Sequence, residues 1–359
     1  MQPFIYDQLP VRVLFGSGMV ERIGAEAERL GIARALVLTT PGQRPLGLRV
    51  AGALGARAAG CFAGAVMHVP IAAAQAARAE ALRLAADGLV AAGGGSTIGL
   101  AKAIALESGL PILALPTTYS GSEMTPIVGI TEEGRKRTER HVRVLPRCVI
   151  YDPVLTLGLP AAVSGPSGMN ALAHCFEALY AEAANPVTSL MAEEGIRALA
   201  AALPVVIAQP DDLAARGDAF YGAWLAGLTL SAVGMALHHK LCHVLGGRFD
   251  LPHAETHAIL LPHVAAYNRR AAPSAMARAA RALGAADAAA GLYALVQGLG
   301  GKVALRDIGM PEGGLDEAAD LACLDPYYNP RPIERGAIRR LLQDAFEGGP
   351  PADGARIGG

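Results

Sequence analysis

The feature that most constrains the fold is a change of sequence pattern near Pro160. Before it, short apolar runs alternate with alanine-rich stretches that carry apolar residues at helical spacing. After it, long helical stretches follow one another with few β-branched runs. Alternating strands and helices predict a parallel sheet covered on both faces, whereas helical stretches alone predict an all-helical domain. We therefore expect an α/β domain at residues 1–159 and an all-α domain at residues 160–359.

Individual elements follow from the same patterns. Four apolar runs that end at Gly, Thr or Pro predict buried strands; they are residues 33–40, 88–95, 111–118 and 147–153. In the second domain we expect helices at residues 168–183, 188–203, 213–247, 272–299 and 333–346. The segment DLPHAETH, which contains His253, is typical of a loop.

Composition excludes several classes of protein. Apolar residues make up 52% and charged residues 18% of 359 residues, so a large core is expected and disorder is not. The net charge of −1 offers no basic face for nucleic acid or an anionic membrane. Five scattered cysteines form no CxxC pair, which fits free thiols in a reducing compartment. With no signal peptide and no apolar run of about 20 residues, we expect a cytoplasmic protein with no membrane partner.

Two polar loops follow successive predicted strands. GGGSTIGLAK opens a helix, so the amides of Gly93, Gly94 and Gly95 can approach a pyrophosphate beside a favourable helix dipole. Hydroxyls in these loops can bind the same group or cap the helix; they belong to Ser96, Thr97, Thr117, Thr118, Ser120 and Ser122. The spacing is not GxGxxG, and either loop alone is also typical of an ordinary turn. Their occurrence on two successive strand ends favours a phosphate-bearing ligand.

Histidines are concentrated in the second domain, where six of nine fall between His238 and His263. The pairs Asn170/His174 and His239/His243 each have i,i+4 spacing, which puts both members on one face of a helix. With His253 they have the spacing of a ligand site, although a single helical histidine is more often structural. A metal site would favour an anionic oxygen ligand, and Asn170 offers a neutral amide instead.

Four further residues lie close in sequence to the candidate site. His257 lies one helical turn after His253 and is expected to line the same site. His238 should point about 100° away from His239, either packed or in solvent. Lys240 and Arg248 add positive charge, which is also what an ordinary surface would carry.

Long ordered motifs give the chain a family resemblance. They are FIYDQLPVRVLFGSG, GGGSTIGLAKAIALE, LPTTYSGSEMTPIVGITEEGRKRT, SGMNALAHCFEALYA, HHKLCHVLGGRFDLPHAETHAILLPH and YYNPRPI. With them the chain resembles the iron-containing (group III) alcohol dehydrogenase superfamily, and within it the branch that reduces maleylacetate. The resemblance implies a Rossmann-like N-terminal domain and an all-α C-terminal domain, a fold shared with dehydroquinate synthase. It also implies NADH or NADPH in the cleft between the domains.

The resemblance assigns roles to single residues. Metal-bearing relatives hold the ion with one Asp and three His, which correspond here to Asn170, His174, His239 and His253. Gly99 is a second departure, because those relatives commonly have Asp there. Both departures imply that no metal is required; a metal, if bound, would use His174, His239 and His253. His243 matches a histidine assigned to proton transfer. The substrate-binding set is Asn170, His174, His239, Lys240, His243, His253 and His257.

The cofactor contacts implied by the resemblance lie in the two polar loops and at the end of the first predicted strand. They are Gly93, Gly94, Gly95, Ser96, Thr117, Thr118 and Ser122. Thr40 stands where NAD-selective relatives often have Asp, so the 2′-phosphate of NADPH is not repelled. We therefore expect both NADH and NADPH to be used.

The expected activity is reduction of the carbon–carbon double bond of maleylacetate, a small dicarboxylate, to 3-oxoadipate by a homodimer. Three alternatives remain. The first is a metal-dependent alcohol or polyol dehydrogenase that accepts Asn170 as a weak ligand. The second is a lyase like dehydroquinate synthase, which uses NAD only transiently. The third is a nucleotide-binding module without catalysis, against which the many polar side chains argue because burying them without a use is costly.

Overall fold

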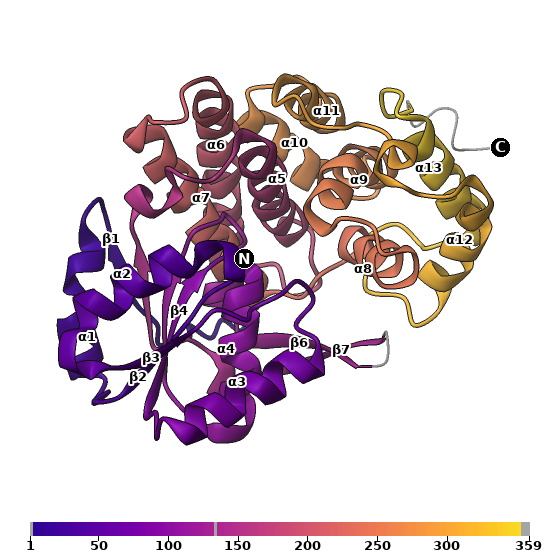
Figure 1. Ribbon diagram of the computed structural model, residues 1–359. Helices are drawn as coiled ribbons and strands as arrows, with labels where there is room; N and C mark the ends of the chain where they lie inside the picture. Colours follow the sequence, from indigo (N-terminus) through magenta and orange to yellow (C-terminus); the bar gives the residue numbers. More distant parts are fainter. Residues whose placement is uncertain (1–2, 133–134, 353–359) are drawn as a thin grey trace. The chain divides into compact units, whose positions relative to one another are not determined.

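The computed structural model describes residues 3–132 and 135–352. The chain forms two compact units (Figure 1). One is the α/β unit, Gln8–Leu159, and the other is the helical unit, which comprises residues 160–352 and residues 3–7. The expected fold class, a parallel α/β domain followed by a helical domain, is confirmed. Residues 3–7, expected in the α/β domain, group with the helical unit instead.

The α/β unit contains a parallel six-stranded sheet with the order β1-β8-β5-β4-β2-β3. Its strands are β1 (Arg12–Phe15), β2 (Ala35–Leu38), β3 (Ala58–Phe62), β4 (Gly88–Gly93), β5 (Ile112–Pro116) and β8 (Cys148–Tyr151). The four strands expected from apolar runs are β2, β4, β5 and β8, which are buried throughout. The sheet edges β1 and β3 are only partly buried, so they lack the continuous apolar pattern that would have predicted them.

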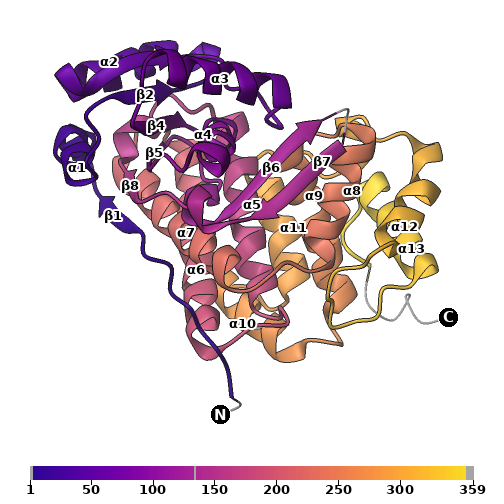
Figure 2. The ribbon, with the colours of Figure 1, turned by 90° about the horizontal axis from the view of Figure 1, so that it is seen from below.

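Two helices cover each face of this sheet. α3 (Ile71–Arg83) and α4 (Gly95–Ser108) pack on side chains such as Leu36 and Leu89. α1 (Ile23–Arg29) and α2 (Arg44–Leu54) pack on the alternate side chains, such as Val37 and Val90. This division follows from the two-residue period of a strand. The antiparallel hairpin of β6 (Ile127–Glu132) and β7 (Arg135–Arg140) forms a separate sheet (Figure 2).

The order of the strands creates a switch point between β2 and β4. The chain leaves β2 toward β3 on one side and leaves β4 toward β5 on the other. In sheets of this kind, ligands bind at the carboxyl ends of the strands beside the switch point. Those ends carry Thr40 and the glycine run Gly93–Gly95, so these two parts of the predicted cofactor site lie at the expected edge of the sheet.

The helical unit is built around α9 (His253–Asn268), against which α5, α8, α11 and α13 all pack. The other helices are α5 (Ala161–Ala178), α6 (Pro186–Ala208), α7 (Leu213–Ala232), α8 (Leu237–Phe249), α10 (Pro273–Leu283), α11 (Ala288–Gly298), α12 (Leu315–Cys323) and α13 (Arg335–Glu347). Because α9 begins at His253, the expectation of a loop around this residue was wrong.

Two of the expected long helices are each a pair. Residues 213–247 break between α7 and α8, whose axes differ by 97°. Residues 272–299 break at Gly284, which has a φ of +65°, and α11 then starts at the cap Asp287. Asp287 accepts a hydrogen bond from the backbone N–H of Ala290, as an N-cap does.

Among the described residues, the stretch Pro273–Gly298 matches a membrane span by length and hydropathy, and the bent pair α7–α8 matches only when counted together. The stretch consists of α10 and α11, each of 11 residues. One such helix reaches about 16 Å, roughly half of a bilayer core of about 30 Å. Core helices pass the same test, so the match assigns no membrane role.

Candidate active site

Helices α5, α8 and α9 bring six histidines together. This histidine cluster consists of His174, His238, His239, His243, His253 and His257. The rings of His174 and His239 stack with centroids 4.9 Å apart, and those of His253 and His257 are 4.5 Å apart. His257 is also 4.8 Å from His239, which joins the two pairs. His243 lies 6.2 Å from His239 and 6.4 Å from His253. The five histidines predicted as site residues therefore share one site with His238.

A buried carboxylate, Glu177, lies in this cluster, and the sequence analysis missed it. It follows Asn170 by seven residues on α5, so both lie on one face of the helix. Its oxygens accept hydrogen bonds from the backbone N–H groups of Ala236 (2.8 Å) and His238 (2.7 Å). Its Oε2 is also 2.7 Å from Nδ1 of His239. The i, i+4, i+7 spacing in NALAHCFE was the signal that pointed to it.

Burial controls the ionisation of Glu177 and His239. It raises the pKa of Glu177 to about 8, although hydrogen bonds from the start of α8 act in the opposite direction. It lowers the pKa of His239 to about 3. Because Nδ1 of His239 is bound to Glu177, the orientation of the ring is fixed and Nε2 is the atom left for a ligand. This Nε2 is buried and has no hydrogen-bond partner among the described residues.

His238 is fully buried, so it packs and does not meet solvent. Its Nε2 is 2.8 Å from Nδ1 of His257 and 3.7 Å from Sγ of Cys242. The ligand atoms of these three residues lie within 4.8 Å of one another. The two imidazole nitrogens are hydrogen-bonded together, however, and Nε2 of His257 has no partner within the described parts of the chain. His257 can therefore present Nε2 to a ligand.

Whether the site fits the iron implied by the resemblance depends on its donor atoms. Oδ1 of Asn170, Nδ1 of His174 and Nε2 of His239 are buried and lack partners among the residues described. With His253 they offer three imidazoles and one amide, and none of these groups is anionic. Glu177 is already bound to His239 and to the start of α8. The donor set thus lacks a carboxylate, so it fits a divalent metal less well than imidazoles with a carboxylate would.

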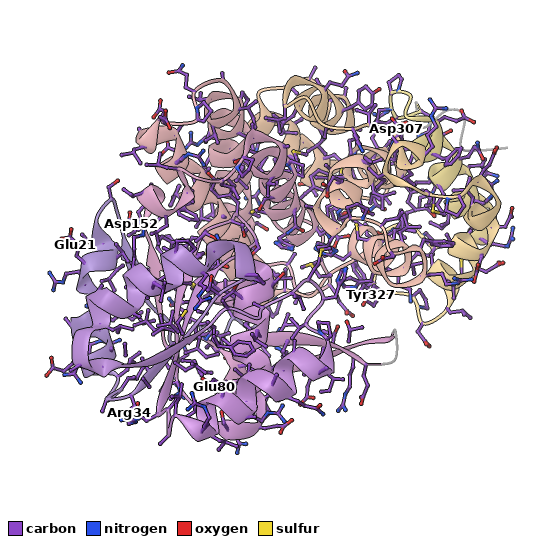
Figure 3. The ribbon with its side chains drawn as sticks, viewed as in Figure 1. Glu21, Arg34, Glu80, Asp152, Asp307 and Tyr327 are labelled. Carbon is purple, nitrogen blue, oxygen red and sulfur yellow. The ribbon has the colours of Figure 1, made fainter. Side chains whose placement is uncertain are left out.

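His243, at the partly exposed side of the cluster, contacts a tyrosine that the sequence analysis missed. Its Nδ1 is 3.2 Å from Oη of Tyr327, and the ring centroids are 6.1 Å apart. Tyr327 is labelled in Figure 3. Nζ of Lys240 lies 5.6 Å from the centre of the Tyr327 ring. Lys240 and His243 are three residues apart on α8 and so share a face. Arg248, in contrast, pairs with Glu317 at 2.6 Å on the surface, as an ordinary surface charge does.

In the α/β unit, the glycine run forms a tight connection between β4 and α4. Gly94 is the N-cap of α4, and Gly95 is its first residue. A Cβ atom on Gly94 would lie 2.8 Å from Cγ2 and Oγ1 of Thr118, so the two predicted loops touch at this point. Partly exposed members of the predicted cofactor set gather here and at the end of β2; they are Thr40, Gly94, Gly95, Ser96, Thr118, Ser120 and Ser122.

Three members of the predicted cofactor set are buried within the unit. Gly93 and Thr97 contact one another, since a Cβ on Gly93 would lie 2.3 Å from Oγ1 of Thr97. Oγ1 of Thr117 accepts a hydrogen bond of 3.0 Å from Nε2 of Gln43. Thr97 and Thr117 are buried, and the expectation that their hydroxyls bind a cofactor stays a prediction. Because Gln43 follows β2 and Thr117 follows β5, this hydrogen bond connects the two sides of the switch point.

Lys102 on α4 holds the second loop from inside the unit, and the sequence analysis did not single it out. Its Nζ is fully buried and donates to the carbonyl oxygens of Ser122 (2.6 Å), Thr125 (2.8 Å) and Ile127 (2.8 Å). Burial lowers the pKa of Lys102 to about 7, and the nearby charge of Glu123 opposes this shift. A lysine within the apolar run LAKAIAL was the available signal.

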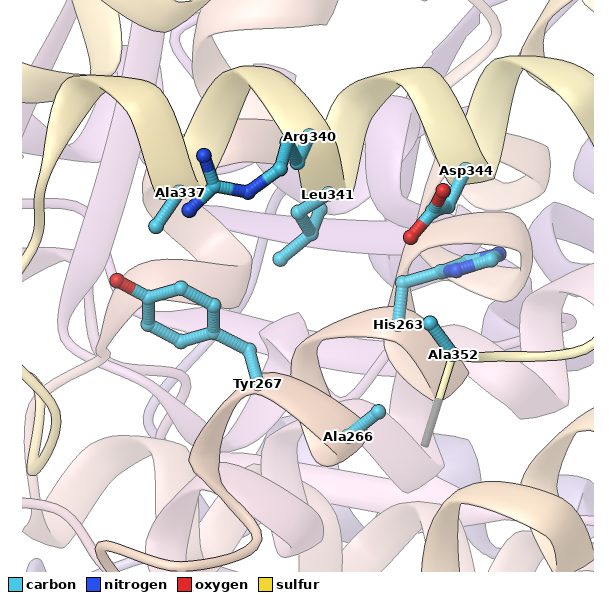
Figure 4. Close-up of a pocket in the computed structure, with 8 residues that line it drawn as sticks. All are labelled: His263, Ala266, Tyr267, Ala337, Arg340, Leu341, Asp344 and Ala352. Atoms are coloured by element: carbon cyan, nitrogen blue, oxygen red, sulfur yellow. The ribbon is translucent and has the colours of Figure 1, made fainter. Parts of the chain in front are cut away.

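A small cavity in the helical unit is separate from the histidine cluster (Figure 4). It is lined by His263, Ala266, Tyr267, Ala337, Arg340, Leu341, Asp344 and Ala352. Its volume of 20 Å³ holds about one water molecule, which is far too little for a dicarboxylate. Burial lowers the pKa of His263 to about 4, as expected for a histidine that packs in the interior and has a structural role.

Comparisons with known proteins cover both units. Family models described as iron-containing alcohol dehydrogenase and as the C-terminal part of that family match residues 10–153 and 165–346. The chain is 57% identical to a maleylacetate reductase from Burkholderia cepacia, over 98% of this chain and 100% of that protein. The crystal structure of a maleylacetate reductase from Agrobacterium tumefaciens matches with a TM-score of 0.95 and 52% identity, covering 98% of this chain and 100% of that one. That of a putative alcohol dehydrogenase from Ralstonia eutropha matches with a TM-score of 0.97 and 61% identity, at the same coverage. The chain therefore belongs to the iron-containing alcohol dehydrogenase family.

Proposed function

We propose that this protein reduces the carbon–carbon double bond of maleylacetate to give 3-oxoadipate, with NADH or NADPH as the hydride donor. Near full-length identity of 57% to a maleylacetate reductase supports this activity. The observation that carries the proposal is a cluster of imidazoles together with the neutral amide of Asn170. By the family resemblance a metal-bearing relative has a carboxylate at this position, whereas the amide keeps hydrogen-bonding groups for an organic anion.

The chemistry explains why such a site is sufficient. Hydride adds to the carbon β to the ketone, so two electrons move onto the ketone oxygen as an enolate. A proton added to the adjacent carbon then gives 3-oxoadipate, and the cofactor leaves as NAD(P)⁺. Interconversion of an alcohol and a carbonyl instead forms a more basic alkoxide, for which a Lewis-acid metal is most useful. An enolate can be stabilised by hydrogen bonds alone.

The roles of the residues follow from their positions. His243 is the proton donor, because it is one of the two partly exposed histidines of the cluster, with His253, and an imidazole can act as a general acid. Asn170, His174 and His253 bind the enolate oxygen or a carboxylate. His239 and His257 present to the substrate their Nε2 atoms, which have no partner among the described residues. Lys240 adds the positive charge that a dicarboxylate requires.

The cofactor belongs to the α/β unit in this proposal. The amides of Gly94 and Gly95 bind the pyrophosphate at the start of α4. Thr40 carries no charge that would repel a 2′-phosphate, so both NADH and NADPH are used. We further propose that no metal is required, and that the enzyme is a cytoplasmic homodimer.

One experiment tests the activity and the metal requirement together. Oxidation of NADH and of NADPH is followed by absorbance with maleylacetate, before and after chelation, on protein whose metal content has been determined by elemental analysis. We expect turnover with both cofactors and no loss on chelation. No NADH oxidation would overturn the proposed function. Activity that is lost on chelation and restored by iron or zinc would support a metal-dependent enzyme instead.

A further inference from the structure

We propose that Tyr327 is the positioning residue of His243, holding Nδ1 of the imidazole so that Nε2 delivers the proton to the substrate. The contact between Oη of Tyr327 and Nδ1 of His243 measures 3.2 Å. This inference rests on the proposed reduction of maleylacetate, in which His243 supplies the proton. Tyr327 itself does not touch the reacting atoms.

The segment that carries Tyr327 is anchored on α9. The side-chain amides of Asn329 and Asn268 exchange hydrogen bonds of 2.8 and 2.9 Å. Oη of Tyr267 donates to the carbonyl oxygen of Pro332 at 2.6 Å, and the guanidinium of Arg331 lies 4.0 Å from the centre of the Tyr267 ring. These contacts fix the backbone just after Tyr327, although the segment between α12 and α13 contains no helix or strand. The phenol is thus held against α8 by a rigid support.

A phenol suits this position because its hydroxyl both donates and accepts hydrogen bonds. Its oxygen can accept from Nδ1–H of His243 both in the imidazolium and in the neutral ring that remains after Nε2 has lost its proton, so the ring keeps its orientation while Nε2 loses and regains a proton. In the reaction, the Nε2–H bond of the imidazolium breaks as a carbon–hydrogen bond forms on the enolate. The neutral imidazole keeps its proton on Nδ1, bound to Tyr327, and solvent restores the proton on Nε2.

The surroundings of Tyr327 keep its hydroxyl protonated. Burial, and then the charge of Glu177, raise the pKa of Tyr327 above its ordinary value. Lys240, over the ring at 5.6 Å, adds a cation–π contact that restrains the phenol. The phenol therefore serves as a neutral partner of His243 across the working pH range.

The test is a double-mutant cycle with Tyr327→Phe and His243→Ala, measured by steady-state kinetics with maleylacetate and NADH. Tyr327→Phe should lower kcat about tenfold, the size of one lost hydrogen bond, and leave the KM for NADH unchanged. In the His243→Ala background it should have no further effect on kcat, because the ring it positions is gone. Tyr328→Phe is the matched control, since Tyr328 is the neighbouring exposed tyrosine, and it should behave as the wild type.

Each outcome decides the proposal. An unchanged kcat in Tyr327→Phe would overturn it, as would the same loss with and without His243. Thermal unfolding of Tyr327→Phe and Tyr328→Phe separates a folding defect from a kinetic one. If a folding defect appears, ¹⁵N chemical shifts of His243 in the folded fraction show directly whether the tautomer has changed, and an unchanged tautomer also overturns the proposal. If the wild type does not reduce maleylacetate, the proposed function itself fails. If the wild type is active and Tyr327→Phe has the same kcat, only the role of Tyr327 fails.

Discussion

The two polar loops of the α/β unit and the histidine cluster of the helical unit are shaped by different physical means. The loops rely on backbone, because Gly94 leaves space where a Cβ would meet Thr118 at 2.8 Å. The cluster relies on side chains from three helices, whose directions are set by partners such as Glu177 and Tyr327. A backbone site should be sensitive to added volume, whereas a side-chain site should be sensitive to lost atoms.

The largest expected effect is in the cluster. His243→Ala should lower kcat by about 10²–10⁴, the range for loss of a general acid. Affinity for NADH, measured by fluorescence titration, should stay near that of the wild type, because the variant leaves the loops of the α/β unit intact. An unchanged kcat would remove His243 as the proton donor.

Asn170→Asp sharpens the comparison by restoring charge to the cluster. The new carboxylate lies at a buried oxygen position one helical turn before His174, so affinity for zinc or ferrous iron should rise roughly a hundredfold. Reductase activity should fall, since a negative charge repels a dicarboxylate. Elemental analysis after dialysis against the metal, with the wild type as the reference, measures the first effect. Equal metal content in both proteins would contradict it.

Gly94→Val tests the opposite rule in the α/β unit. The added side chain must displace Thr118, so the KM for NADH should rise about tenfold to a hundredfold, with a smaller change in kcat. Gly158→Val is the control, because a Cβ there meets no atom within 4 Å. A normal KM for NADH in Gly94→Val would show that the glycine run is not a cofactor site.

The smallest effect concerns stability. Burial lowers the pKa of Lys102 in the folded state to about 7 from 10.5, so the unfolded chain binds more protons between these values. The free energy of unfolding should therefore rise with pH across this window, on the order of 1–2 kcal/mol from about pH 7 to about pH 9. Lys102→Met should remove this rise in urea titrations, whereas Lys302→Met, at an exposed lysine that also donates to a carbonyl oxygen, should retain it. The same slope in both variants would exclude Lys102 as its source.

Local sequence predicts features that are formed locally. The strand-to-glycine transition at β4 and the i,i+4 pairs on α5 and α8 are encoded within a few residues, so both were foreseen. Glu177 lies 62 residues from His239, and Tyr327 lies 84 residues from His243. Such contacts depend on how helices pack, which spacing alone does not reveal.

Burial of single side chains is what local sequence leaves open in the α/β unit. Thr97 and Thr117 belong to hydroxyl-rich loops, and composition cannot tell which hydroxyls face inward. Thr117 is turned toward Gln43, 74 residues away in sequence. In the helical unit, the break before α8 was missed because residues 213–247 remain apolar across it. The backbone N–H of Ala236 at this break donates to Glu177, which lies on another helix.

Glu177 has a consequence for attempts to redesign this enzyme. The same carboxylate accepts hydrogen bonds from the first backbone amides of α8 and fixes His239. A library that varies the cluster toward new substrates can therefore exchange His174 or His257 singly, but selection at position 177 will also report on whether α8 forms. Libraries built on this scaffold should keep Glu177 constant and place diversity on the neighbours that do not support a helix.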